Sequence, residues 1–150
     1  MFKHLVLGCL LLLTACSQLD KADNLQYYQV ETSKPYADVL AELEIAIAEH
    51  NFRITGHSRV GKVIRERGAA DYPEYDTLQF CNLTHAKTVL DISPHAIMYM
   101  PCNIVVYQFA GKNIVKTHML PTDGDNAELN RFFQQMNNEL KQIVDFAVEQ

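Results

Sequence analysis

Apolar residues recur every three or four positions in two long stretches of the chain, and this spacing predicts two amphipathic helices. The first is expected to start around Pro35, a residue tolerated in a first helical turn, and to run to about His50. The second is expected after Pro121, where Asp125 and Glu128 have the spacing of a capping box. Its apolar face is continuous along the helix and comprises Leu129, Phe132, Phe133, Met136, Leu140, Ile143, Val144 and Ala147. Such a face must cover a sheet.

Segments that alternate in polarity or are rich in β-branched and aromatic residues predict five strands. They are residues 26–30, 52–55, 75–81, 103–109 and 114–119, with the second ending near Gly56. The run 103–109 has the strongest strand composition and is expected at the centre of the sheet. The turn that follows it predicts an antiparallel hairpin with the last strand.

Two shorter segments have helical spacing. Residues 83–92 form a helix that Asn82 can cap and that stops before Pro94. Residues 59–68 also have helical spacing, but their length is marginal. Together these elements predict a single α+β domain over residues 26–150, an antiparallel sheet with long helices packed on one face. The chain has no internal repeat and no room for a second domain.

The N-terminus follows a different pattern. Lys3 precedes an apolar run, residues 5–13, which is too short to span a bilayer and reads as a signal peptide. The sequence Leu13-Thr14-Ala15-Cys16 resembles the bacterial lipobox, so residues 1–15 are expected to be removed and Cys16 to be lipidated, with palmitate among its acyl chains. A signal peptide cleaved without lipidation is the alternative. Residues 16–25 are polar and are expected to serve as a tether.

These features predict the location of the protein. By analogy with bacterial sorting, Ser17 after the lipidated cysteine favours the outer membrane, with the domain facing the periplasm. Two or three acyl chains on one residue give stable attachment to a membrane. The net charge is -5 and becomes -6 when Lys3 is removed with the signal peptide. This acidity argues against nucleic acid as a partner.

Two cysteines remain as thiols in the mature domain, Cys81 and Cys102. The cell envelope permits disulfides, so a structural disulfide is the favoured interpretation. Free thiols, a redox pair and a metal site stay open as alternatives.

The segments around these cysteines resemble the domain-of-unknown-function 302 (DUF302) family. The resemblance rests on Phe80-Cys81-Asn82, on Met100-Pro101-Cys102-Asn103 with the apolar strand after it, and on Met119-Leu120-Pro121. Asn82 and Pro101 are the motif residues beside the two cysteines. Leu83 stands where the family often has Pro, and Met100 where it has Leu.

The resemblance implies a β-α-β4-α domain similar to the TATA-box-binding-protein fold, often a homodimer, with no established activity. Family members without export signals look to have the cysteine pair too, which weakens a purely structural role for a disulfide.

Soft side chains gather near the two cysteine motifs and suggest a copper site. Thiolate and thioether ligands select Cu(I). The candidate ligands are Cys81, His85, Met100, Cys102 and His118, with Met98 and Met119 nearby. Against this, the cysteines lack C-x-x-C spacing, and methionine is equally expected as core filler.

Other motifs are weaker. Residues 56–63 nearly match a phosphate-binding loop, but Val63 replaces the hydroxyl residue that would hold Mg²⁺, so a turn with two glycines is preferred. Four basic residues, Arg59, Lys62, Arg65 and Arg67, form a cluster expected to be a solvated face. Three histidines, His50, His57 and His95, are expected at exposed element ends.

No catalytic signature occurs in the sequence. The sequence therefore predicts a lipid-anchored, non-enzymatic accessory or binding domain that recognises an envelope protein or a small ligand. A copper-binding or thiol-redox protein is the alternative.

Overall fold

The computed structural model describes residues 26–149; the predicted signal peptide, Cys16 and the tether lie outside the described residues. Along the chain the elements are β1 (Tyr27–Thr32), α1 (Tyr36–Glu49), β2 (Arg53–Arg59), α2 (Val60–Glu66), β3 (Tyr75–Cys81), α3 (Leu83–Ile92), the 3-10 helix η1 (Pro94–Tyr99), β4 (Cys102–Phe109), β5 (Lys112–His118) and α4 (Ala127–Val148).

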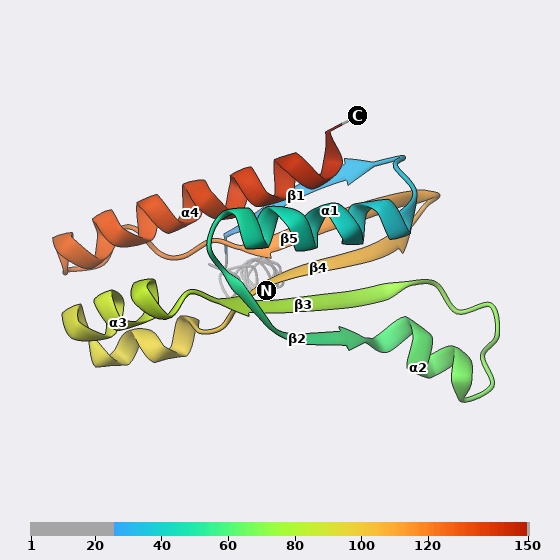
Figure 1. Cartoon of the computed structure of the whole chain (residues 1–150), viewed down its shortest axis with the longest axis horizontal. Helices are drawn as coiled ribbons and strands as arrows, with labels where there is room; N and C mark the ends of the chain where they lie inside the picture. Colours follow the sequence, from blue (N-terminus) through green and yellow to red (C-terminus); the bar gives the residue numbers. More distant parts are fainter. Residues whose placement is uncertain (1–25, 150) are drawn as a thin grey trace, which may run out of the picture.

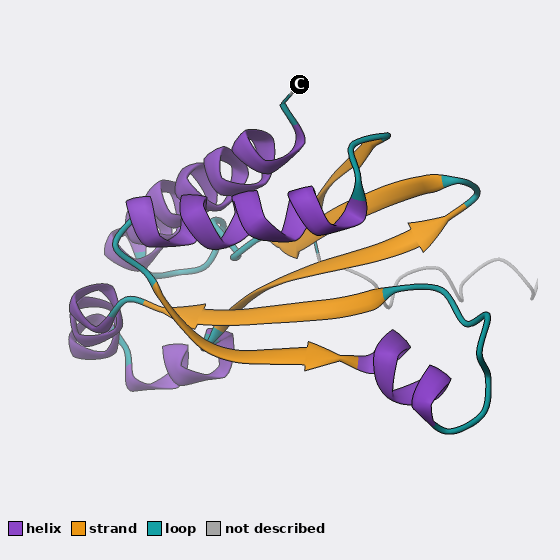
Figure 2. Ribbon diagram, turned by 45° about the vertical axis from the view of Figure 1, so that its right-hand side comes forward, coloured by secondary structure: helices purple, strands orange, loops and turns teal. Residues whose placement is uncertain are grey.

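The strands form one antiparallel sheet in the order β1-β5-β4-β3-β2. The strand that the sequence placed at the centre, β4, is the middle strand, and it forms the expected hairpin with β5. Helices α1 and α4 lie side by side on one face of the sheet (Figures 1 and 2). The predicted α+β class, with an antiparallel sheet and helices on one face, is confirmed.

The core lies between these two helices and the sheet. The helices contribute Val39, Leu43 and Ile47 from α1 and Leu140, Ile143 and Val144 from α4, all fully or almost fully buried. The sheet contributes Leu78, Phe80, Ile104, Val106 and Val115, which alternate with outward-facing residues along their strands. Burial of each such side chain stabilises the fold by about 1.5–3 kcal/mol.

Strand β2 is longer than predicted. It does not end near Gly56 but continues to Arg59, because the pairing with β3 shifts register between Ile54 and Gly56. A bulge of this kind absorbs one extra residue without ending the strand. The marginal helical segment after it is α2, Val60–Glu66.

The caps of α3 and α4 were predicted with different success. Asn82 caps α3 as expected: its side-chain oxygen accepts hydrogen bonds from the amides of Thr84 and His85. In α4 the N-cap is Asn126, not Asp125, and its side-chain oxygen accepts from the two amides that follow, each at 3.0 Å. The predicted cap was therefore one residue too early. No helix among residues 26–149 is long and apolar enough to cross a membrane.

Candidate functional site

The two cysteine motifs meet at one end of the sheet. Cys81 is the last residue of β3 and Cys102 the first of β4. Because the two strands are antiparallel neighbours, with Phe80 opposite Cys102, the end of one strand lies beside the start of the other. Asn82, the residue after Cys81, is the N-cap of α3. His85 therefore lies in the first turn of this helix, close to the two cysteines.

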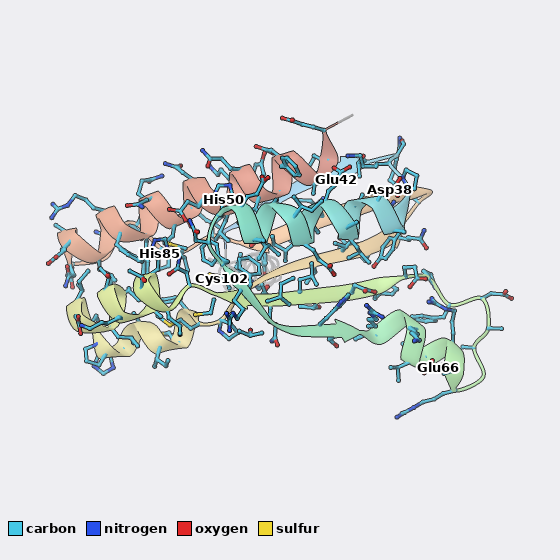
Figure 3. The ribbon with its side chains drawn as sticks, viewed as in Figure 1. Asp38, Glu42, His50, Glu66, His85 and Cys102 are labelled. Atoms are coloured by element: carbon cyan, nitrogen blue, oxygen red, sulfur yellow. The ribbon has the colours of Figure 1, made fainter. Side chains whose placement is uncertain are left out.

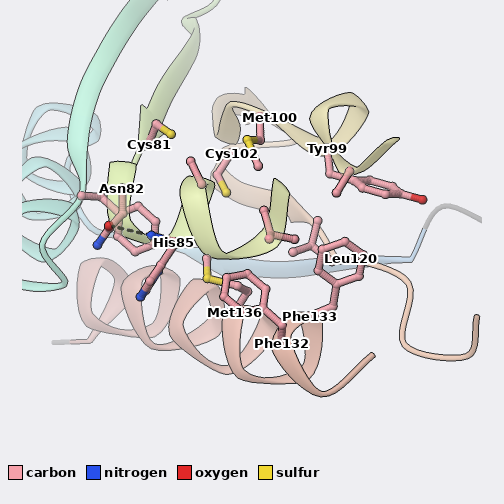
Figure 4. A pocket seen from close by; sticks show the side chains of 14 residues that line it. Cys81, Asn82, His85, Tyr99, Met100, Cys102, Leu120, Phe132, Phe133 and Met136 are labelled. Atoms are coloured by element: carbon pink, nitrogen blue, oxygen red, sulfur yellow. Dashed lines mark hydrogen bonds between the residues drawn. The ribbon is translucent and has the colours of Figure 1, made fainter. Parts of the chain in front are cut away.

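A small cavity of about 40 Å³ lies where these segments face α4 (Figure 4). Its walls are mostly apolar. The strand ends, α3, η1 and the chain after β5 supply Phe52, Cys81, Asn82, His85, Ala86, Val89, Ala96, Tyr99, Met100, Cys102 and Leu120, and α4 supplies Phe132, Phe133 and Met136. Figure 3 shows His85 and Cys102 in this region, far from α2 at the other end of the molecule.

His85, one of the residues that line this cavity, has an unsatisfied polar atom. Its ring packs edge-to-face against Phe52 and Phe132, each with a centroid distance of 5.8 Å. Its Nδ1 is buried and is the one buried side-chain polar atom among the described residues without a hydrogen-bond partner. The nearest carboxylate oxygen, Oε2 of Glu139, is 3.9 Å away, beyond hydrogen-bond distance. Leaving a buried polar atom unpaired costs free energy, so a ligand that pairs with it gains affinity.

Both cysteines are free thiols in the structure. Burial, with a smaller contribution from the neighbouring Cys81, raises the pKa of Cys102 to about 11. The thiol is therefore protonated at neutral pH and a poor nucleophile. The predicted disulfide stays a prediction.

Four of the five candidate copper ligands, Cys81, His85, Met100 and Cys102, line the cavity. His118 does not join them. It ends β5 on the opposite face of the sheet from buried Thr117, where its ring contacts that of Tyr27 at a centroid distance of 4.6 Å. Within residues 26–149, no group of three or more His, Cys, Asp or Glu side chains is close enough to hold a metal ion.

A larger hollow lies next to the cavity. A groove of about 1040 Å³ runs between η1 and the chain after β5, and it shares Tyr99, Met100, Cys102 and Leu120 with the cavity. Pro101, the second motif residue, also lines the groove, and a cis peptide bond joins it to Met100. The motif around Cys102 therefore separates a small apolar cavity from a wide, partly polar groove.

The contribution of α4 to the cavity was not predicted. The apolar periodicity of this helix predicted a buried face, but not which of its residues lie over the cysteines. Phe132, Phe133 and Met136 line the cavity because α4 extends beyond the sheet to the region of α3 (Figure 4).

The near match to a phosphate-binding loop has a packing explanation. Residues 56–59 belong to strand β2, so they form no loop. Gly61 is buried, and a Cβ on it would lie 2.4 Å from the carbonyl oxygen of Pro73 and 2.7 Å from the amide nitrogen of Tyr75. The glycine is needed for this close approach. In the basic cluster, Arg65 donates hydrogen bonds to Glu74 and to the carbonyl oxygen of Tyr72, both at 2.7 Å.

The prediction for His57 was wrong. This histidine lies inside β2, not at an exposed element end, because the strand continues past Gly56. Its Nε2 is 2.6 Å from Oδ2 of Asp76, a carboxylate whose side chain is 5% exposed. The pair connects the edge strand β2 to β3 through side chains as well as through the backbone.

The fold and the cavity define the class: a small α+β domain with an antiparallel sheet, helices on one face, and two cysteine motifs around an apolar cavity. The model of a domain of unknown function, DUF302, matches residues 28–147, so the chain belongs to the DUF302 family. This confirms the family resemblance seen in the two cysteine motifs.

The chain is also similar to a solved structure, that of an uncharacterized conserved DUF302 protein from Bacillus stearothermophilus. The TM-score is 0.71 with 21% sequence identity, over 82% of this chain and 98% of that chain. At this identity the likeness supports the fold alone. Among curated proteins, none matches the chain.

Proposed function

We propose that this DUF302 protein is a lipid-anchored, non-enzymatic binding domain of the cell envelope, and that its ligand site is the cavity at the two cysteine motifs. The observation that carries the binding role is the apolar cavity formed by both cysteine motifs, one of whose lining residues, His85, has a buried Nδ1 without a hydrogen-bond partner. The export signal and Cys16 support the location, with the outer membrane and the periplasm as the expected site.

The size of the two hollows limits the ligand. A cavity of about 40 Å³ holds only a small group, whereas a groove of about 1040 Å³ holds a whole small molecule. The ligand we expect therefore has a small apolar end that fills the cavity. The remainder of the ligand would lie in the groove.

The cavity can be tested with small probes. Ethanol and xenon, titrated separately into the 15N-labelled domain, are expected to shift the amide signals of Ala86, Val89 and Cys102. An Ala86→Leu variant fills the cavity and should lose these shifts, whereas Ala41→Leu, on the exposed side of α1, should keep them. Shifts that persist in folded Ala86→Leu would contradict a ligand site in this cavity.

The anchor can be tested independently. Cells fed labelled palmitate are expected to label the wild-type protein but not a Cys16→Ala variant. Cys9→Ala is the matched control, because Cys9 lies in the apolar run of the leader and should not affect labelling. An unlabelled wild-type protein would support simple cleavage of the signal peptide and would contradict lipidation.

A second candidate function is binding of Cu(I). One observation favours it: the sulfur-bearing residues Cys81, Met100 and Cys102 line the same cavity as His85. Soft ligands of this kind select Cu(I). Titration of the reduced domain with Cu(I), against a coloured chelator, is expected to give one bound equivalent. Cys81→Ser and Cys102→Ser should each weaken binding; an unchanged stoichiometry and affinity in both variants would exclude this function.

A further inference from the structure

Helices α3 and η1 form one segment of chain, residues 83–99, that begins and ends at the cysteine motifs. The segment leaves the sheet after Cys81, the last residue of β3, and the chain returns to the sheet at Cys102, the first residue of β4. The two helices contact each other near the end of β3, as both ribbon views show (Figures 1 and 2). Because β3 and β4 are paired neighbours, both ends of the segment are held at one place, and the segment can move without disturbing the sheet.

The hydrogen bonds of this segment are all local. Its side-chain hydrogen bonds are the Asn82 cap, the bond from Thr88 to the carbonyl oxygen of Thr84, and the bond from Lys87 to Asp91. Its backbone hydrogen bonds at the helix ends also stay between residues 82 and 100. Among the described residues, no hydrogen bond therefore joins residues 83–99 to α4 or to the sheet.

Apolar contacts hold the segment against α4, and they form a cluster of their own. Its buried members are Val89 from α3, Ala96 from η1 and Phe133 from α4, and the ring of Tyr99 lies edge-on to that of Phe133 at a centroid distance of 5.1 Å. This α3–η1 cluster has three buried residues, against fifteen in the main core. A segment with few buried contacts opens at a lower free energy than the whole domain unfolds.

His85, in the first turn of α3, makes the closed arrangement costly. Its ring packs against Phe52 and Phe132, which lie outside the segment. Its buried Nδ1 has no hydrogen-bond partner, because the nearest carboxylate oxygen, on Glu139, is 3.9 Å away. When the segment moves away from α4, water can reach this nitrogen, and the cost of leaving it unpaired is removed.

We propose that residues 83–99 are a lid over the cavity, which opens as a unit to admit the apolar end of the ligand and then closes over it. The cavity of about 40 Å³ is the closed state, and it holds only a small group. The segment supplies His85, Ala86, Val89, Ala96 and Tyr99 to the walls, so its movement opens the cavity while α4 and the sheet stay in place. What enters the cavity rests on the proposed function, but the opening itself is a property of the protein without a ligand.

Two half-buried leucines provide a matched pair of variants. Leu90 lies on α3 and packs against the α3–η1 cluster without lining the cavity, and Leu40 lies on α1 and packs against the main core. Leu90→Ala and Leu40→Ala therefore remove the same atoms from the lid and from the body of the domain. A third variant, His85→Phe, keeps an aromatic ring but has no nitrogen to leave unpaired.

Hydrogen exchange of the whole protein, followed peptide by peptide with mass spectrometry, measures the opening without a ligand. Relative to their unstructured rates, residues 83–99 are expected to exchange at least about tenfold faster than residues 103–109 of the central strand. Leu90→Ala should speed exchange roughly tenfold in residues 83–99 only, whereas Leu40→Ala should speed it in α1 and the sheet. His85→Phe should slow exchange of residues 83–99 roughly threefold to tenfold.

A titration with 1-hexanol connects the opening to ligand entry. Its alkyl chain is longer than the small group that the closed cavity holds, so it requires the lid to move. The rate of dissociation, measured from the line widths of the amide signals, is expected to rise roughly tenfold in Leu90→Ala and to stay unchanged in Leu40→Ala.

The proposal would be overturned by any of three results. These are exchange of residues 83–99 at the rate of the central strand, equal effects of the two leucine variants on residues 83–99, and a hexanol dissociation rate that Leu90→Ala leaves unchanged. A wild-type protein that does not bind hexanol would contradict the proposed ligand site instead, and hydrogen exchange would still decide whether the lid opens. The two failures are therefore distinguishable.

Discussion

The side-chain amide of Asn137 forms two hydrogen bonds with the backbone of Leu120. Its Oδ1 accepts from the Leu120 amide at 2.8 Å, and its Nδ2 donates to the Leu120 carbonyl oxygen at 2.9 Å. Asn137 lies on α4 and is 5% exposed, while Leu120 belongs to the chain after β5 and lines both the cavity and the groove. This pair fixes one wall of the candidate site to the longest helix.

We expect Asn137→Leu to lower the free energy of unfolding by about 2–4 kcal/mol. The substitution keeps the shape of the side chain but leaves an amide and a carbonyl of Leu120 without partners, and each costs about 1–3 kcal/mol when buried. Chemical denaturation measures the loss. Asn138→Leu, at the exposed neighbouring position, should change stability by less than about 0.5 kcal/mol. Similar values for both variants would show that the Leu120 hydrogen bonds are not stabilising.

The His57–Asp76 pair predicts a second large effect on stability. His57→Ala leaves a nearly buried carboxylate without its 2.6 Å partner, so we expect a loss of about 1.5–3 kcal/mol. His95→Ala removes an exposed histidine and serves as the control. Hydrogen exchange should also show faster opening of β2 in His57→Ala only. Unchanged exchange in β2 would contradict a side-chain link between the two strands.

Cys102 should react slowly with alkylating reagents in the folded, reduced protein. Burial raises the pKa of Cys102 to about 11, so at pH 8.5 its thiolate fraction is on the order of 100-fold smaller than that of an ordinary cysteine. The alkylation rate of a folded Cys81→Ser domain, followed by mass spectrometry, should still be rising at about pH 10, where the rate of an ordinary thiol has levelled off. The same variant unfolded in urea should react at the ordinary rate. Equal rates in the folded and unfolded states would contradict the burial of the Cys102 thiol.

Two tyrosines should make the fold sensitive to alkaline pH. The hydrogen bond from Tyr28 to Asp145, together with burial, raises the pKa of Tyr28, and burial together with the nearby Asp76 raises the pKa of Tyr36. Because each folded-state pKa lies above the unfolded value of about 10, the stability involved is fully present below pH 10 and is lost as the pH rises above it.

Denaturation curves taken across this pH range test the effect. Tyr28→Phe and Tyr36→Phe should each flatten the alkaline loss of stability, whereas Tyr72→Phe, at an exposed position, should not. A slope that is the same in wild type and in both core variants would show that these phenols do not control the alkaline transition.

The oxidation state of Cys81 and Cys102 can be measured directly. The sequence predicts an oxidised pair in the envelope, whereas the structure holds both residues as free thiols. The intact mass of the protein isolated from envelopes should therefore rise by two hydrogens on reduction, and Cys81→Ser should show no rise. A wild-type mass that reduction leaves unchanged would refute the disulfide.

Much of the architecture follows from local patterns. The spacing of apolar residues predicted α1 and α4, the composition of residues 103–109 predicted the central strand, and Asn82 predicted the start of α3. In each case the signal lies within a few residues of the element that it specifies. The error at the end of β2 has a local cause as well. Gly56 looked like a strand end because glycine is common in turns, and a bulge allowed the strand to continue.

The site itself could be predicted only in part. The sequence grouped Cys81, His85, Met100, Cys102 and His118 as candidate ligands. The first four line one cavity, but the side chain of His118 points to the other face of the sheet. Strand alternation at the end of β5 decides this, because a shift of one residue would reverse the direction of every side chain.

By itself, the sequence determined the α+β class, the family and the residues of the two cysteine motifs that line the cavity, because each is written in a short stretch of chain; the export leader and its lipidation motif stay predictions. Only the tertiary structure decided that α4 lines the cavity, that Nδ1 of His85 is buried without a hydrogen-bond partner, that His57 lies beside Asp76, and that within residues 26–149 no helix covers one face of the sheet. These features depend on contacts between residues far apart in the chain, whose partners are fixed by strand register and helix packing, not by local propensity.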